Sequence, residues 1–172
     1  MQNLADSRAL AQLMVELAQA SGIKTVAVLS SMEQPLGLAI GNALEVKEAA
    51  AVLTNNGPDD LRELSLTLAA ELILLAGLAP DRAQAVDLAR QQLTSGAALA
   101  KFRQMIAAQG GDTDFSHLPV SPLVVEYRAR ESGYLTAIDA RKIGLAALCL
   151  GAGRQKKEDV IDPAAGIILR HK

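Results

Sequence analysis

The chain has 172 residues, of which 50% are hydrophobic, only 2% are aromatic and none is Trp. This length suits one domain with a sizeable core or part of a larger one, and the core must be built from Leu, Ala, Val and Ile. The formal net charge is −2, so no basic excess attracts nucleic acid or an anionic membrane. Cys149 is the single cysteine, which excludes an intrachain disulfide and suits a reducing cytoplasm.

Neither the N-terminal residues nor the most apolar stretch indicates a membrane or secretory segment. The first twelve residues, MQNLADSRALAQ, contain no basic region followed by an apolar run. The most apolar stretch, Leu72 to Ala79, is shorter than the roughly 20 residues that a transmembrane helix needs. We interpret it as part of a buried helix and expect a soluble cytoplasmic protein.

The chain begins with a predicted helix, capped by Asp6 or Ser7 and ended by Gly22. Its apolar residues recur at spacings of three and four and form one stripe: Leu10, Leu13, Met14 and Leu17. The next segment, Lys24 to Ser30 (KTVAVLS), is β-branched and nearly continuously apolar, which predicts a buried strand. A helix, a tight turn and a buried strand in succession indicate an α/β layer.

A glycine-containing loop from Ser31 to Gly41 then leads into a second predicted helix. Asn42 is its expected cap, with Glu45 in the capping-box position. A third helix is expected to start at Asp59 or Asp60. Because apolar residues surround it nearly completely, we expect this helix to be central.

Two further helices are expected, from Asp81 to about Thr94 and from about Ala97 to Gln109. After Asp112 the composition changes, and a connector with two prolines leads into a predicted hairpin. Its strands are Leu123 to Arg128 and Tyr134 to Ile138. A short helix from Ala140 to Leu150, ended by Gly151, and a final strand from Gly166 to Arg170 complete the chain.

The residues that commonly carry catalysis are isolated in this sequence. His117 lies in a polar connector, His171 is next to the last residue, and Cys149 sits in an apolar helix as an expected core residue. The stretch Gly151 to Arg154 follows a helix, so a left-handed cap and a turn explain it better than a phosphate site.

The loop with Gly37 and Gly41 precedes a helix and admits two kinds of ligand. An anion is physically possible at a helix N-terminus, but no Lys or Ser accompanies the glycines as in a P-loop. Alternatively, loop carbonyls and a carboxylate from the following helix suit a hard cation, with Glu45 and Glu48 as candidates. The simpler readings are a capping-box role for Glu45 and a solvated Glu48 beside Lys47.

The run SSMEQPLGLAIGNALEVKEAAAVL, Ser30 to Leu53, resembles the central segment of pyrimidine-nucleoside and thymidine phosphorylases. Four further segments match in the same order: Gly57 to Gly77, Ser95 to Asp112, Glu131 to Arg154, and Lys157 to Lys172. The resemblance implies an α/β fold class, with this chain forming part of the large α/β domain. Residues 1–112 would be part of that central domain, and residues 113–172 a small α+β C-terminal segment that is interrupted at its end.

The resemblance also implies an activity: a pyrimidine nucleoside and phosphate react to give the free base and a pentose 1-phosphate. In the family, a glycine-rich phosphate loop, a Ser/Thr-rich stretch, and an Arg and a Lys hold the substrates. This sequence contains no GGVGDK-like loop and no RDVTATVES-like helix. We therefore assign no catalytic or substrate-binding residue, expect the chain alone to be inactive, and expect an N-terminal half as its partner.

One family site does carry over by resemblance. The relatives hold a potassium ion with two loop carbonyls and a glutamate, which correspond here to Leu36, Ala39 and Glu48. The other ligands would come from the absent phosphate loop. We therefore expect the chain alone to bind potassium weakly.

Two other functions remain open. The lobe could serve as a non-catalytic interaction module, for which a monodisperse monomer would argue, whereas apolar faces left exposed by the missing half would favour self-association. A phosphoribosyl-transfer enzyme such as anthranilate phosphoribosyltransferase ranks last, because its glycine-rich diphosphate motif is not present in the sequence.

Overall fold

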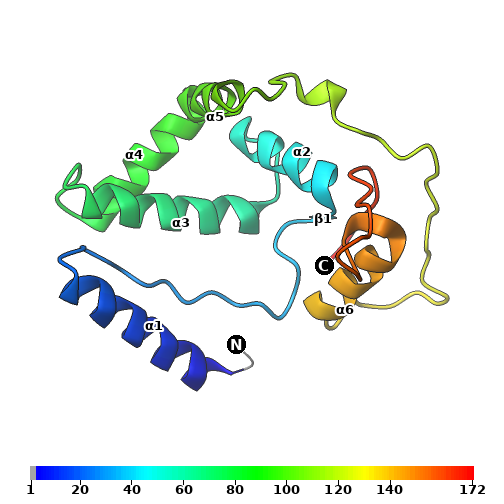
Figure 1. The fold of residues 1–172 in the computed structure, drawn as a ribbon, viewed down its shortest axis with the longest axis horizontal. Coiled ribbons are helices and arrows are strands. Elements are labelled where there is room, and N and C mark those ends of the chain that lie inside the picture. The colour runs from blue at the N-terminus through cyan, green and yellow to red at the C-terminus, as the bar shows by residue number, and fades with distance from the viewer. Residues whose placement is uncertain (1–2) are drawn as a thin grey trace. The chain divides into compact units, whose positions relative to one another are not determined.

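The structure is a computed structural model that describes residues 3–172, and they form two compact units. One unit comprises the chain up to Ser31 together with Glu63–Gln92. The other comprises Met32–Arg62 and Leu93–Lys172. Figure 1 shows helices as the dominant element, with a very small sheet. This helix-rich architecture agrees with the predicted α/β fold class, whereas a domain boundary between residues 112 and 113 stays a prediction.

The first unit contains α1 (Leu4–Ala20), much of α3 (Asp59–Leu75) and most of α4 (Arg82–Thr94). The α1 helix starts earlier than predicted, because the Asn3 side chain accepts a hydrogen bond from the Asp6 amide and caps it. The α4 helix starts as predicted, since Asp81 accepts the Gln84 amide at 2.9 Å. No helix in residues 3–172 is long and apolar enough to span a membrane.

The predicted strand from Lys24 to Ser30 is wrong. In the described chain this segment is extended but belongs to no sheet. Its Val26 and Leu29 side chains are 48% and 44% exposed. A strand is defined by hydrogen bonds to a neighbouring strand, and none of the described residues supplies that neighbour.

The other predicted helices form, although their burial differs from expectation. They are α2 (Asn42–Leu53), α3, α5 (Ala97–Ala108) and α6 (Ala140–Ala147). The cap of α2 is Gly41 instead of Asn42. The expectation that α3 is central and that Leu72 begins a buried stretch is wrong, because Leu72 is 67% exposed although Ala70 is fully buried.

The predicted hairpin is also wrong. Both of its segments are irregular, and Val124, Tyr127 and Tyr134 are 80%, 94% and 98% exposed. Two isolated strands are only marginally stable without a covering layer. The connector before them contains a short 3-10 turn, Phe115–His117, whose Phe115 ring stacks on Phe102 of α5.

The predicted final strand is confirmed in a shorter form and has a partner. β2 (Ile167–Ile168) pairs antiparallel with β1 (Ala39–Ile40), and Ala39 lies opposite Ile168. The Ala43 amide, in the first turn of α2, donates to the Pro163 carbonyl at 3.0 Å. The last residues of the chain therefore fold back onto the loop and helix around residues 36–43.

Two glycines allow this contact between backbones. A Cβ added to Gly166 would lie 2.2 Å from the Ile40 carbonyl oxygen, and one added to Gly41 would lie 2.4 Å from that of Ala165. Gly41 also has a φ of +140°, which disfavours other residues. Gly151, after α6, has a φ of +101°, which confirms the left-handed cap expected there.

We predict that Gly166→Ala destabilises the second unit by about 1–3 kcal/mol, because the added methyl group must displace backbone atoms. Urea unfolding followed by circular dichroism measures the change. Gly133→Ala is the matched control, since nothing lies within 4 Å of a Cβ at that position. Equal stability of the two variants would contradict the close approach.

Candidate functional site

The loop before α2 is fastened to that helix by one carboxylate. Glu48, two turns into α2, accepts the amides of Leu38 and Ala39 through Oε1, at 2.8 and 3.0 Å. The residue is half-buried. The interpretation of Glu48 as a solvated partner of Lys47 is therefore wrong. Amide donors to an ionised carboxylate form strong hydrogen bonds, so Glu48 determines the shape of the loop.

Gly37 is shaped to fit this carboxylate. Its φ is +71°, and a Cβ there would lie 2.1 Å from Glu48 Oε2. The second carboxylate oxygen thus lies directly against the loop backbone. A side chain at residue 37 would collide with it and strain the backbone.

A lysine that is distant in the sequence, Lys172, also binds this loop. Lys172 Nζ donates to the carbonyls of Pro35 and Gly37 at 2.7 and 2.9 Å and forms an ion pair with Asp60. Asp60 also accepts the Gly37 and Leu61 amides. Neither role could be predicted from local sequence, because Lys172 contacts positions 112 to 137 residues away and the contact of Asp60 with Gly37 spans 23 residues.

Opposing effects act on the pKa of Asp60. Burial works to raise the pKa, but the hydrogen bonds from Lys172, Gly37 and Leu61 outweigh it and hold the pKa below its ordinary value. Because the pKa of Asp60 is lowered in the folded chain, its ionised carboxylate stabilises the fold at pH values above the ordinary Asp pKa. That contribution is lost as the pH falls through the lowered pKa.

The structure brings the predicted ligands Leu36, Ala39 and Glu48 into one loop-and-helix segment. The Leu38 carbonyl accepts the Leu169 amide, whereas the Ala39 amide turns to Glu48. In an antiparallel ladder the N–H and C=O of one residue point to the same edge. The Ala39 carbonyl therefore faces away from β2, on the side of Glu48. Leu36 lies between the two residues whose carbonyls bind Lys172.

This arrangement differs from a side-chain metal cluster. Within residues 3–172, no group of three or more His, Cys, Asp or Glu side chains could hold a metal ion. The segment instead offers backbone carbonyls and one carboxylate, which suit hard cations.

The start of α2 does not favour an anion. Glu45 Oε1 accepts the Gly41 amide at 3.1 Å, so a carboxylate already satisfies a donor there. Glu45 thus accepts the amide of the cap residue as expected, but the predicted capping box with Asn42 does not form, because Gly41 is the N-cap and no side chain caps the helix. The Asn42 side chain donates to the Ala152 carbonyl at 3.3 Å, beside a small pocket of about 180 Å³.

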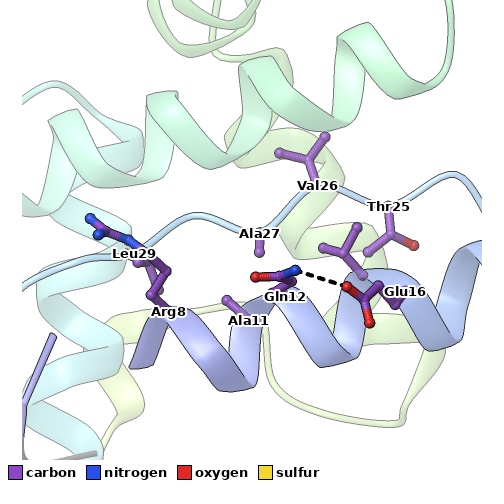
Figure 2. Close-up of a pocket in the computed structure, with 9 residues that line it drawn as sticks. Arg8, Ala11, Gln12, Glu16, Thr25, Val26, Ala27 and Leu29 are labelled. Atoms are coloured by element: carbon purple, nitrogen blue, oxygen red, sulfur yellow. Dashed lines mark hydrogen bonds between the residues drawn. The ribbon is translucent and has the colours of Figure 1, made fainter. Parts of the chain in front are cut away.

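A second, open groove lies in the first unit, between α1 and the segment Thr25 to Leu29 (Figure 2). Its polar side chains include Arg8, Gln12 and Glu16. The Gln12 amide donates to Glu16 at 2.9 Å, so these two groups satisfy each other. The rest of its lining is largely aliphatic, and the groove offers no converging set of charges for chemistry.

Two further candidate residues remain, Cys149 and His117. Cys149 is exposed, so the expectation of a core cysteine is wrong. His117 Nδ1 lies 2.7 Å from Asp112 Oδ2, and its Nε2 lies 3.6 Å from an Asp114 oxygen. The hydrogen bond to Asp112 and the charges of both carboxylates raise the pKa of His117.

Comparisons with known proteins cover most of the chain. Residues 1–99 match the α/β domain of a glycosyl transferase family, and residues 134–172 match the pyrimidine nucleoside phosphorylase C-terminal domain. Proteins named pyrimidine-nucleoside phosphorylase are 47% identical in Staphylococcus epidermidis and 45% identical in Geobacillus stearothermophilus. Each match covers 100% of this chain and 41% of the relative. The chain thus spans about two fifths of the length of these relatives.

We predict that Glu48→Ala lowers the free energy of unfolding by about 1.5–3 kcal/mol, the value of a hydrogen bond to a charged group. The Leu38 and Ala39 amides would lose their acceptor. Urea unfolding measures the loss. Glu63→Ala, at an exposed position of α3, is the control, and an equal effect of both changes would contradict the role of Glu48.

We also predict that His117 titrates above the ordinary histidine value of about 6.5 and that Asp112→Asn lowers its pKa. Proton NMR of the imidazole signals across pH measures both. Because the folded pKa is raised, any stability from the protonated ring is present below pH ~6.5 and is lost as the pH rises through the folded pKa. An unchanged pKa in Asp112→Asn would contradict the assignment.

Proposed function

Because the chain belongs to the pyrimidine-nucleoside phosphorylase family, we propose that it is the C-terminal portion of such an enzyme. The whole enzyme would react a pyrimidine nucleoside with phosphate and release the base and a pentose 1-phosphate. The observation that carries the proposal is the match over 100% of this chain to 41% of relatives with that name. The single cysteine suits the reducing cytoplasm as the setting.

The chain alone is proposed to be inactive. Phosphorolysis needs donors that stabilise phosphate and the departing base inside a closed cleft. The sequence motifs that supply those donors in the family do not occur in these residues. The missing segment with the phosphate loop is therefore the proposed partner, and nucleoside and phosphate are substrates of the two portions together.

Potassium is the proposed cofactor, with the Leu36 and Ala39 carbonyls and the Glu48 carboxylate as one part of its site. Two observations support this fit. The Ala39 peptide turns toward Glu48, and both amide hydrogen bonds to Glu48 go to Oε1, which leaves Oε2 beside Gly37. A bound potassium ion would neutralise the carboxylate and link this loop to the phosphate loop.

A non-catalytic interaction module is the second candidate, and exposed side chains in the irregular segment that follows the connector favour it. Leu123, Val124 and Val125 are 73%, 80% and 78% exposed, and apolar patches of this kind attract partners. Size-exclusion chromatography with light scattering separates the two functions. A stable monomer favours an independent module, whereas association relieved by the missing portion favours the enzyme fragment.

We predict that the chain alone releases no base from thymidine or uridine in the presence of phosphate. The same residues, substituted for the matching region of the Geobacillus stearothermophilus relative, should give an active chimaera. Chromatographic measurement of free base tests both. Robust turnover by the chain alone would contradict the proposed role.

The chimaera also tests the potassium site. Glu48→Gln in the chimaera should remove most of the stimulation by potassium, because a neutral amide attracts a cation less strongly than a carboxylate. Glu63→Gln is the control, since this residue is exposed on α3. Equal stimulation in both variants would argue against Glu48 as a ligand.

A further inference from the structure

The ammonium group of Lys172 is surrounded by oxygen atoms in the way that a small cation is. Its acceptors are the carbonyls of Pro35 and Gly37, at 2.7 and 2.9 Å, and the Asp60 carboxylate. The Lys172 side chain is only 14% exposed. Lysine side chains are seldom so well covered unless they are paired, because ordering and desolvating them is costly.

The acceptors of Lys172 lie in the same loop that Glu48 holds. Glu48 binds the N–H groups of Leu38 and Ala39, and Lys172 binds the C=O groups of Pro35 and Gly37. The Glu48 carboxylate thus binds N–H groups of the loop, and the Lys172 ammonium binds C=O groups of neighbouring loop residues. Gly37 joins the two interactions, since its amide donates to Asp60 and its carbonyl accepts from Lys172.

We propose that Lys172 is a positioning residue, a tethered monovalent cation that fixes the loop at residues 35–39. With the Pro35 and Gly37 carbonyls bound to the ammonium, the Leu36 and Ala39 carbonyls remain for a mobile cation. Only this last step rests on the proposed potassium site. The fixing of the loop by Lys172 stands on the contacts alone.

The chemistry of the side chain suits this role. An ammonium group has three donors, and here they meet three oxygen acceptors. Arginine would present a planar fork that matches carboxylates better than converging carbonyls. Lys172→Arg is therefore expected to restore the loop only in part, although it keeps the charge.

Hydrogen exchange of the loop amides tests the proposal on the chain itself. In Lys172→Met the Gly37 and Leu38 amides should exchange about tenfold to a hundredfold faster, the range expected for loss of a hydrogen bond to a charged group. Lys142→Met is the matched control, because Lys142 is 83% exposed beside Asp139. It should leave these amides unchanged.

Chemical rescue separates a cation site from a general loss of stability. Ammonium chloride should restore slow exchange in Lys172→Met, because the free ion can donate to the three vacated acceptors. Tetramethylammonium chloride at the same ionic strength has no N–H donor and should not. Unchanged exchange in Lys172→Met, or equal effects of the two salts, would overturn the proposal.

Two further variants keep the test decisive. If Lys172→Met fails to fold, Lys172→Gln replaces it, because a neutral amide has only two donors for the three acceptors; faster exchange at Gly37 and Leu38 is expected, and unchanged exchange would overturn the proposal. In the double variant Lys172→Met/Glu48→Gln, rescue by ammonium should persist, since Glu48 is not an acceptor of Lys172. Persistent rescue would support a role of Lys172 that is independent of the potassium site, whose own test is Glu48→Gln in the chimaera, whereas loss of rescue would overturn the role of Lys172.

Discussion

The arrangement of the second unit depends on the two hydrogen bonds that the consecutive amides of Leu38 and Ala39 donate to the Glu48 carboxylate. This interaction folds the loop onto α2, and it places Ala39 and Ile40 where they can pair with Ile168 and Ile167. The C-terminal residues are held to the rest of the unit through that pairing and through Lys172. A loop of irregular backbone needs such partners, since its amides and carbonyls have no neighbouring helix or strand to satisfy them.

Glycines make this arrangement possible where the chain has no room for side chains. Gly37 lies against the carboxylate, and Gly41 and Gly166 let two backbones approach closely. The buried residues nearby are small, as Ala43, Ala147 and Ala165 illustrate. With so few large side chains in the core, polar contacts and close backbone packing contribute much of the local order of this loop.

Local patterns in the sequence predicted the helices well. The stretches that became α4 and α5 carry their own start and stop signals, such as the Asp81 cap and the glycine pair after Gln109. Strands were predicted poorly, because the segment from Lys24 to Ser30 needs neighbouring strands that local composition cannot supply. Local reasoning left Glu48 open between a cation ligand and a solvated residue beside Lys47, and the family resemblance favoured the ligand. Neither approach found Lys172 or Asp60, since their contacts depend on the folded chain.

The Glu48 carboxylate and the loop carbonyls are proposed to form only one part of a potassium site. Calorimetric titration of the chain with potassium chloride, against sodium chloride at equal ionic strength, tests it most directly. Weak binding to the chain alone is expected from this proposal, because the carbonyls and the carboxylate of these residues leave the coordination shell incomplete. Tight binding that Glu48→Gln abolishes would contradict it, since the site would then be complete within these residues.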